Sequence, residues 1–149
     1  MTSTVSTTIE GTASEVWDTL ADGWLYGLWV VGASRIRDVD GSWPAPGSKI
    51  HHSVGSWPLV IDDTTSVVTC EADRRLVLQA RAWPSGEAQV DITIEEQADG
   101  TLVSMSEDAT HGPALLVPSV VRRAVLDRRN TESLKRLTHL VEHRTRPGS

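Results

Sequence analysis

Glu107 and His52 are polar residues in two segments of alternating polarity, where the neighbours two positions away are apolar. Because successive side chains of a strand point to opposite faces, both residues are expected on the core side of a sheet. An unpaired buried charge is costly, so Glu107 would need a cation such as Arg123 or His52. Held in this way, a carboxyl or imidazole can act as a general acid or base, which makes both residues candidate catalytic groups. A structural carboxylate paired with an arginine, and a satisfied core histidine, are the alternatives.

A third polar feature lies in the long helix predicted over Pro118–Arg144. Its C-terminal half carries an apolar stripe of Leu134, Leu137 and Val141. Followed backwards at helical spacing, the stripe meets polar residues and then apolar ones again, namely Asn130, Asp127, Arg123 or Ala124, Val120 and Leu116. Since buried polar groups without partners cost ~1–3 kcal/mol each, a dry core along the whole helix would not fit this pattern. The break indicates a wet cavity or polar partners on the sheet, and a rotation that turns Asn130 to solvent is the alternative.

The elements that must position these residues are mostly strands. Alternating segments predict strands over Thr4–Glu10, Ser34–Asp40, Ser48–Gly55, Leu59–Glu71 (with a bulge near Asp62-Asp63), Arg74–Trp83, Glu87–Glu96 and Thr101–Thr110. Short turns such as Asp99-Gly100 make the later strands antiparallel neighbours. Two helical pieces separate the first two strands: Ala13–Leu20, with Thr12 as N-cap and Glu15 completing a capping box, and Trp24–Val31, which is apolar on nearly all sides and is expected to be buried.

One long helix cannot cover both faces of so large a sheet. The sheet is therefore expected to curl around the helix over Pro118–Arg144 and to leave a hollow between them. Tryptophan, with six residues against one tyrosine and no phenylalanine, suits the lining of such a hollow because its ring is large and apolar and carries a donor N–H. The expected lining consists of Trp24, Trp29, His52, Trp57, Leu78, Ile92, Met105, Glu107, Arg123 and Asn130. Three Trp-Pro pairs at strand ends fit a cavity mouth, a core cap or a subunit contact, so a homodimer is one alternative.

Composition limits the function classes. At 149 residues the chain is expected to be one domain, 1–149, with a frayed tail at about 145–149. The net charge of −6 argues against a nucleic-acid partner. A single cysteine excludes an intrachain disulfide, and the absence of a signal-like start or a long apolar run predicts a cytoplasmic protein that does not insert into membranes. No nucleotide-binding, hydrolase or metal motif is present, so neither a cofactor nor a metal is expected.

Several segments together resemble the START/Bet v 1-like (SRPBCC) superfamily, and within it the polyketide cyclase/dehydrase-like proteins of bacteria. These segments are Val5–Glu10, Ala13–Asp22, Trp29, Pro46–Ser48, Gly100–Glu107, Arg129-Asn130 and Leu134–Leu137. The resemblance implies an α+β helix-grip fold, in which a seven-stranded antiparallel sheet wraps around the C-terminal helix and two short helices lie between strands 1 and 2. It also implies a cavity for a lipid, a polyketide or another apolar small molecule. Some relatives close rings, and many only bind or carry ligands.

Three functions follow as hypotheses. The first is a protein that binds a small, largely apolar ligand, with His52, Glu107, Arg123 and Asn130 orienting its polar atoms. The second is a polyketide cyclase, aromatase or dehydratase that uses Glu107 or His52 for proton transfer. The third is a non-catalytic interaction module with exposed tryptophans as contacts.

Overall fold

A computed structural model describes residues 4–31, 33–54, 61–82 and 86–144. Seven strands form one antiparallel sheet in the order β1-β7-β6-β5-β4-β3-β2. They are β1 (Thr4–Ile9), β2 (Ala33–Val39), β3 (Lys49–Val54), β4 (Ile61–Glu71), β5 (Arg75–Ala82), β6 (Gly86–Gln97) and β7 (Gly100–His111). The helices are α1 (Ala13–Leu20), α2 (Tyr26–Trp29) and α3 (Ser119–Arg144), with short 3-10 turns η1 (Gly23–Leu25) and η2 (Pro113–Leu116). The predicted helix-grip fold is thus confirmed.

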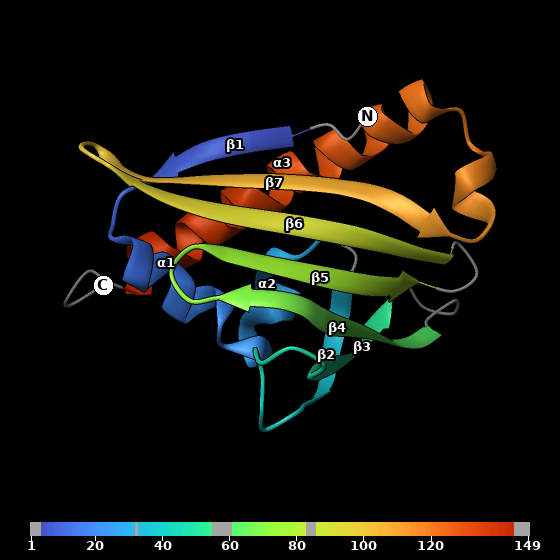
Figure 1. The fold of residues 1–149 in the computed structure, drawn as a ribbon, viewed down its shortest axis with the longest axis horizontal. Coiled ribbons are helices and arrows are strands. Elements are labelled where there is room, and N and C mark those ends of the chain that lie inside the picture. Colours follow the sequence, from blue (N-terminus) through green and yellow to red (C-terminus); the bar gives the residue numbers. More distant parts are fainter. Residues whose placement is uncertain (1–3, 32, 55–60, 83–85, 145–149) are drawn as a thin grey trace.

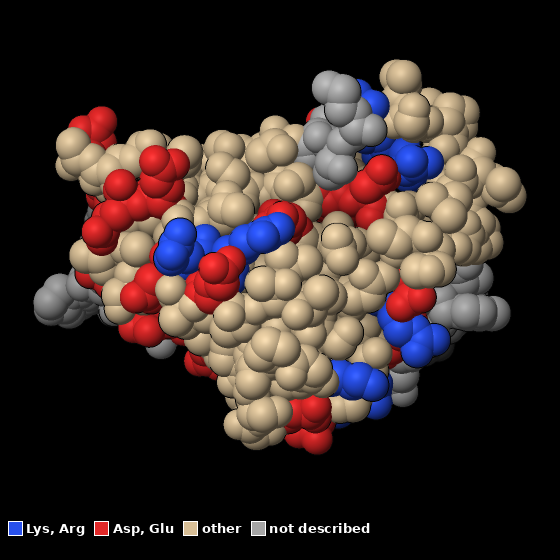
Figure 2. Space-filling model, viewed as in Figure 1, with Lys and Arg blue, Asp and Glu red and all other residues tan. Residues whose placement is uncertain are grey.

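The long helix α3 lies behind the sheet and crosses β1 and β7, while α1 and α2 close the same side nearer to the other strands (Figure 1). The opposite face of the sheet is solvated. Figure 2 shows acidic and basic groups side by side on it, and Arg75 and Asp91, for example, are 2.6 Å apart. Apolar side chains of the strands therefore gather on the face that α3 covers.

The hydrophobic core fills the part of this concave face that lies against the C-terminal half of α3. The strand register aligns one row of side chains across five strands, consisting of Val5, Met105, Ile92, Leu76 and Cys70. Ile92, Leu76 and Met105 in this row are buried, and they share one core with Leu134, Leu137 and Val141 of α3. The predicted apolar stripe of the helix is confirmed in this half.

Helix α1 starts where its cap is predicted. The Thr12 side chain accepts a hydrogen bond from the backbone N–H of Glu15 at 3.1 Å, which satisfies one of the free donors of the first turn. Val16, Trp17 and Leu20 then face the core.

Three sequence predictions about local structure are wrong. The segment expected to be one buried helix over Trp24–Val31 is η1 followed by the single turn α2, and it is amphipathic: Tyr26 and Trp29 are buried, whereas Trp24 and Leu28 are exposed. The register shift of β4 lies between Val67 and Thr69 and not near Asp62-Asp63.

The third error concerns the first turns of α3. Leu116 and Val120 were expected to resume the buried stripe, but both are exposed, because η2 and the start of α3 extend past the core. The predicted strand ends at Gly55, Leu59 and Trp83 lie outside the described residues.

Candidate functional site

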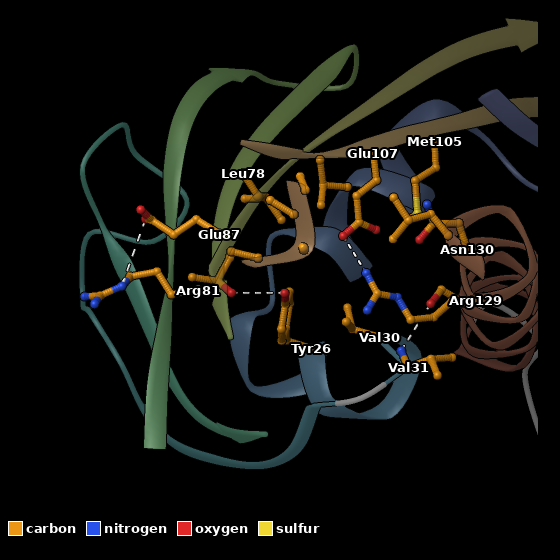
Figure 3. A pocket seen from close by; sticks show the side chains of 18 of the residues that line it. Tyr26, Val30, Val31, Leu78, Arg81, Glu87, Met105, Glu107, Arg129 and Asn130 are labelled. Carbon is orange, nitrogen blue, oxygen red and sulfur yellow. Dashed lines mark hydrogen bonds and ion pairs between the residues drawn. The ribbon is translucent and has the colours of Figure 1, made fainter. Parts of the chain in front are cut away.

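A cavity of about 190 Å³ lies between the concave face of the sheet and α3 (Figure 3). Its walls come from β3 to β7, from α2 and from one face of α3. The cavity is mainly apolar, and polar side chains reach it from α2, from the strands and from α3.

Small side chains on neighbouring strands explain why this space is unfilled. The register places Thr65 of β4 opposite Ala80 of β5, Ala80 opposite Ala88 of β6, and Ala88 opposite Ala109 of β7. All four line the cavity. A row of three alanines and a threonine leaves room that leucine or isoleucine would occupy, so the hollow is a direct result of side-chain size.

The neighbouring row, two residues along each strand, contains larger residues. Leu78 opposes Val90, and Val90 opposes Glu107, and all three line the cavity. One row further, Ile92 lies in the filled core and is not part of the lining. Side-chain size therefore increases along the strands from the hollow towards the packed core.

Glu107 is paired with an arginine of α3. Arg129 Nη2 donates a hydrogen bond of 2.5 Å to Glu107 Oε2, and the two side chains differ sharply in exposure, 5% for Glu107 and 40% for Arg129. The expectation of a buried, cation-paired carboxylate is fulfilled, but the cation is neither Arg123 nor His52. An ion-paired carboxylate of this kind matches the structural alternative more closely than a free general acid.

The helix phase explains why Arg129 takes this place. The cavity-facing residues of α3 are Arg122, Leu126, Arg129, Asn130 and Ser133, which follow mostly four-residue steps. The stripe predicted from the sequence steps back from Asn130 to Asp127 and then to Arg123 or Ala124, and so selects a different face of α3. Arg122 instead lines the cavity and donates to Asp108 Oδ1 at 2.7 Å, and this bond lowers the pKa of the Asp108 carboxyl.

A buried hydrogen-bonded chain occupies the α2 side of the cavity. The Tyr26 hydroxyl lies 3.1 Å from Thr65 Oγ1, and His52 Nε2 lies 2.8 Å from the same oxygen. The rings of Tyr26 and His52 stack at 5.7 Å. Burial lowers the pKa of His52 and raises the pKa of Tyr26 to about 12, so both side chains are neutral near pH 7.

Three polar groups at the cavity have no hydrogen-bond partner among the residues that the structure describes. Two are the Trp29 ring N–H and His52 Nδ1, both buried. The third is the side-chain amide of Asn130, a residue that is 4% exposed and lies beside Met105 and the Glu107–Arg129 pair (Figure 3). Buried polar groups are normally satisfied, so unsatisfied ones in a cavity are candidates for ligand contacts.

The structure thus brings six of the ten predicted lining residues to one cavity: Trp29, His52, Leu78, Met105, Glu107 and Asn130. It does not place Trp24, Ile92 or Arg123 there. Trp24 is 56% exposed on η1, Ile92 belongs to the filled row, and Arg123 lies one helix position away from the cavity-facing Arg122. Trp57 lies outside the described residues.

Sequence reasoning missed Tyr26, Thr65 and Arg129 as cavity residues. Tyr26 carries a weak signal, because it is the only tyrosine in a chain rich in tryptophan. Thr65 carries none, since threonine is common in strands. Within the described ranges, no three histidine, cysteine or acidic side chains converge on a potential metal site, and no helix has the length and apolar character needed to cross a membrane.

A curled seven-stranded antiparallel sheet that grips a long C-terminal helix over a cavity defines the START/Bet v 1-like superfamily, as the resemblance implied. Within it, the chain belongs to the family of the activator of Hsp90 ATPase homolog 1-like proteins, whose model matches residues 10–142. Among curated proteins, no sequence matches the chain.

Several solved structures share the fold at low sequence identity. A protein from Nitrosomonas europaea is 14% identical, with a TM-score of 0.71 and coverage of 97% of this chain and 96% of that one. Ara h 8.0201 is 11% identical, with a TM-score of 0.73 and coverage of 96% and 98%. The di-domain ARO/CYC StfQ from the steffimycin biosynthetic pathway is 12% identical, with a TM-score of 0.73, and the match covers 96% of this chain and 51% of StfQ.

Proposed function

We propose that this protein binds a small, largely apolar molecule in the cavity between the sheet and α3. The observation that carries the proposal is the row of small side chains, which leaves a hollow next to an otherwise well-packed core. Ligand sites typically combine apolar walls with a few placed polar groups. The alanines, Leu78 and Val90 supply such walls, and Tyr26 and Asn130 are among the polar groups.

The size of the cavity limits the ligand. An apolar cavity of about 150 Å³ is enough to bind benzene. A cavity of about 190 Å³ therefore favours a body of one ring or two, and a longer molecule would extend towards Ala114 and Arg122. Among the lipid- and polyketide-like ligands expected from the sequence, compact ring compounds fit best.

Titration calorimetry with a panel of small aromatic and alicyclic compounds tests this proposal. We expect saturable binding of at least one compound, and we expect Ala88→Leu to abolish it because the new side chain occupies the hollow. Ala124→Leu, at an exposed position of α3, is the matched control and should leave binding unchanged. Absence of saturable binding across the panel would refute the proposal.

A second candidate is catalysis of a cyclase, aromatase or dehydratase type, and the observation that favours it is His52. Its neutral imidazole stacks on Tyr26, and its Nδ1 has no partner among the described residues. Glu107 is the weaker candidate because Arg129 holds its carboxylate. Turnover of a reactive polyketone would have to fall in His52→Ala or Glu107→Gln; if both variants retain it, this assignment fails. The unfilled interior argues against the third hypothesis, a pure interaction module.

A further inference from the structure

The polar groups that are free to contact a ligand are neutral. Asn130 offers an amide N–H₂ and a carbonyl, and Trp29 offers a ring N–H. Trp29 Nε1 is buried without a hydrogen-bond partner among the described residues. The side chain of Asn130, also buried at the cavity, makes no hydrogen bond to any of those residues. Trp29 can only donate and the Asn130 amide can donate, whereas the role of His52 Nδ1 depends on the tautomer, so a hydrogen-bond acceptor is the ligand group that complements the first two.

The charged side chains of the lining are already paired. Glu107 binds Arg129 at 2.5 Å, and Arg122 binds Asp108 at 2.7 Å. Arg81 lies 4.0 Å from Glu87 and 3.7 Å from Asp63. An anionic ligand would find no unpaired arginine in the described lining. Near Asn130 it would lose its hydration beside the Glu107–Arg129 pair without gaining a cation of its own, which is costly.

From these two observations we infer the class of ligand: a neutral molecule of one or two rings, whose carbonyl oxygen accepts a hydrogen bond from the Asn130 amide. The apolar body lies against Leu78, Val90 and the alanine row. This inference rests on the proposed function, and it adds Asn130 as the residue that determines ligand specificity. A carboxylate of the same shape is excluded by the paired charges.

Three small probes of nearly equal shape test the inference: acetophenone, which carries a carbonyl, ethylbenzene, which lacks it, and benzoate, which is an anion. One net hydrogen bond to an otherwise unsatisfied buried group is worth about tenfold in affinity. We therefore expect calorimetry on the wild-type chain to give roughly tenfold tighter binding of acetophenone than of ethylbenzene, and no measurable binding of benzoate.

The matched variants separate Asn130 from the rest of the cavity. Asn130→Leu should lower the preference for acetophenone over ethylbenzene from about tenfold to about one, since it removes the donor and keeps the branched shape of the side chain. Thr131→Ala, at the exposed neighbouring position, should keep the tenfold preference. The wild-type probe series alone still decides the inference if Asn130→Leu does not fold.

Nuclear magnetic resonance provides a direct reading of the contact. Asn130 is the only asparagine in the sequence, so its side-chain amide gives a single N–H₂ pair, whereas Gln79, Gln89 and Gln97 supply the internal reference signals. Acetophenone should shift the Asn130 pair far more than the glutamine pairs. Equal affinity for acetophenone and ethylbenzene, tighter binding of benzoate, or an unmoved Asn130 pair on binding overturns this inference and leaves the proposed function intact. Failure of all three probes to bind overturns both.

Discussion

We predict that removing Arg129 lowers the free energy of unfolding more than removing the charge of Glu107, although the two residues form one ion pair. The Glu107 side chain is 5% exposed and the Arg129 side chain 40%. Loss of Arg129 leaves a buried carboxylate without its cation, which costs about 3–5 kcal/mol in proteins. Loss of the Glu107 charge leaves an arginine that can turn to water, so we expect a cost of about 1 kcal/mol, typical of one hydrogen bond.

The measurement is urea unfolding of Arg129→Met, Glu107→Gln and the double variant, followed by tryptophan fluorescence. We expect Arg129→Met to lower the free energy of unfolding by ~3 kcal/mol or more. The double variant should be more stable than Arg129→Met alone, because it no longer buries a charge. The slope of the free energy against urea should stay constant, which would show that only stability has changed.

An exposed ion pair on the same helix is the control. Arg136 and Glu132 are 3.3 Å apart with side chains 45% and 46% exposed, so Arg136→Met should cost only ~0.3–0.5 kcal/mol. If Arg129→Met is no more harmful than Arg136→Met, the Glu107 carboxylate reaches water without its partner. The inference that the inner cavity rejects anions would then lose its physical basis.

Four further predictions concern the cavity and the helix cap. Ala88→Leu should eliminate ligand binding and lower the free energy of unfolding by no more than ~1 kcal/mol, because the added carbons enter free space. Tyr26 is the only tyrosine, so phenolate absorbance should show a pKa of about 12 in the folded chain and about 10 in urea, and a folded value near 10 would refute its burial. Because the pKa of His52 is lowered in the folded chain, the unfolded chain takes up a proton at a higher pH than the folded chain does. The free energy of unfolding should therefore fall as the pH drops below about 6.5, and in His52→Gln it should fall less over the same pH range. Thr12→Ala should cost ~1 kcal/mol of unfolding free energy through loss of the α1 cap, and an unchanged stability would contradict the capping role.

Most of the strands and the start of helix α1 were predictable from the sequence because the signals that mark them are local. Strands β5 to β7 follow strict alternation, and Thr12 with Glu15 marks the start of α1. The position of His52 and Glu107 on the covered face also follows from alternation alone. These features depend only on the two-residue period of a strand and on capping chemistry.

The partners of the site residues were not predictable in the same way. A choice between Arg123 and Arg129 as partner of Glu107 depends on the rotation of α3, and a step of three or four residues per turn selects different side chains. The exposed start of α3 shows the same limit, since Val120 is apolar but has no sheet beneath it. The polarity pattern of the sequence predicts which face of a helix or strand is buried, but the packing of the elements determines which side chains contact that face.

The small residues that form the hollow are present in the sequence, but only the strand register shows that they lie side by side. Each of β5, β6 and β7 has alanine near one end of its inner face and larger residues farther along. The register aligns Ala80, Ala88 and Ala109 in one row and places Ile92 in the filled row. Because packing at one end of the sheet stabilises the fold, the other end is free to keep small side chains. Binding and stability can thus be altered separately in this chain: substitutions of Ala80, Ala88 or Ala109 should change ligand affinity, and substitutions of Ile92 or Leu76 should change the free energy of unfolding.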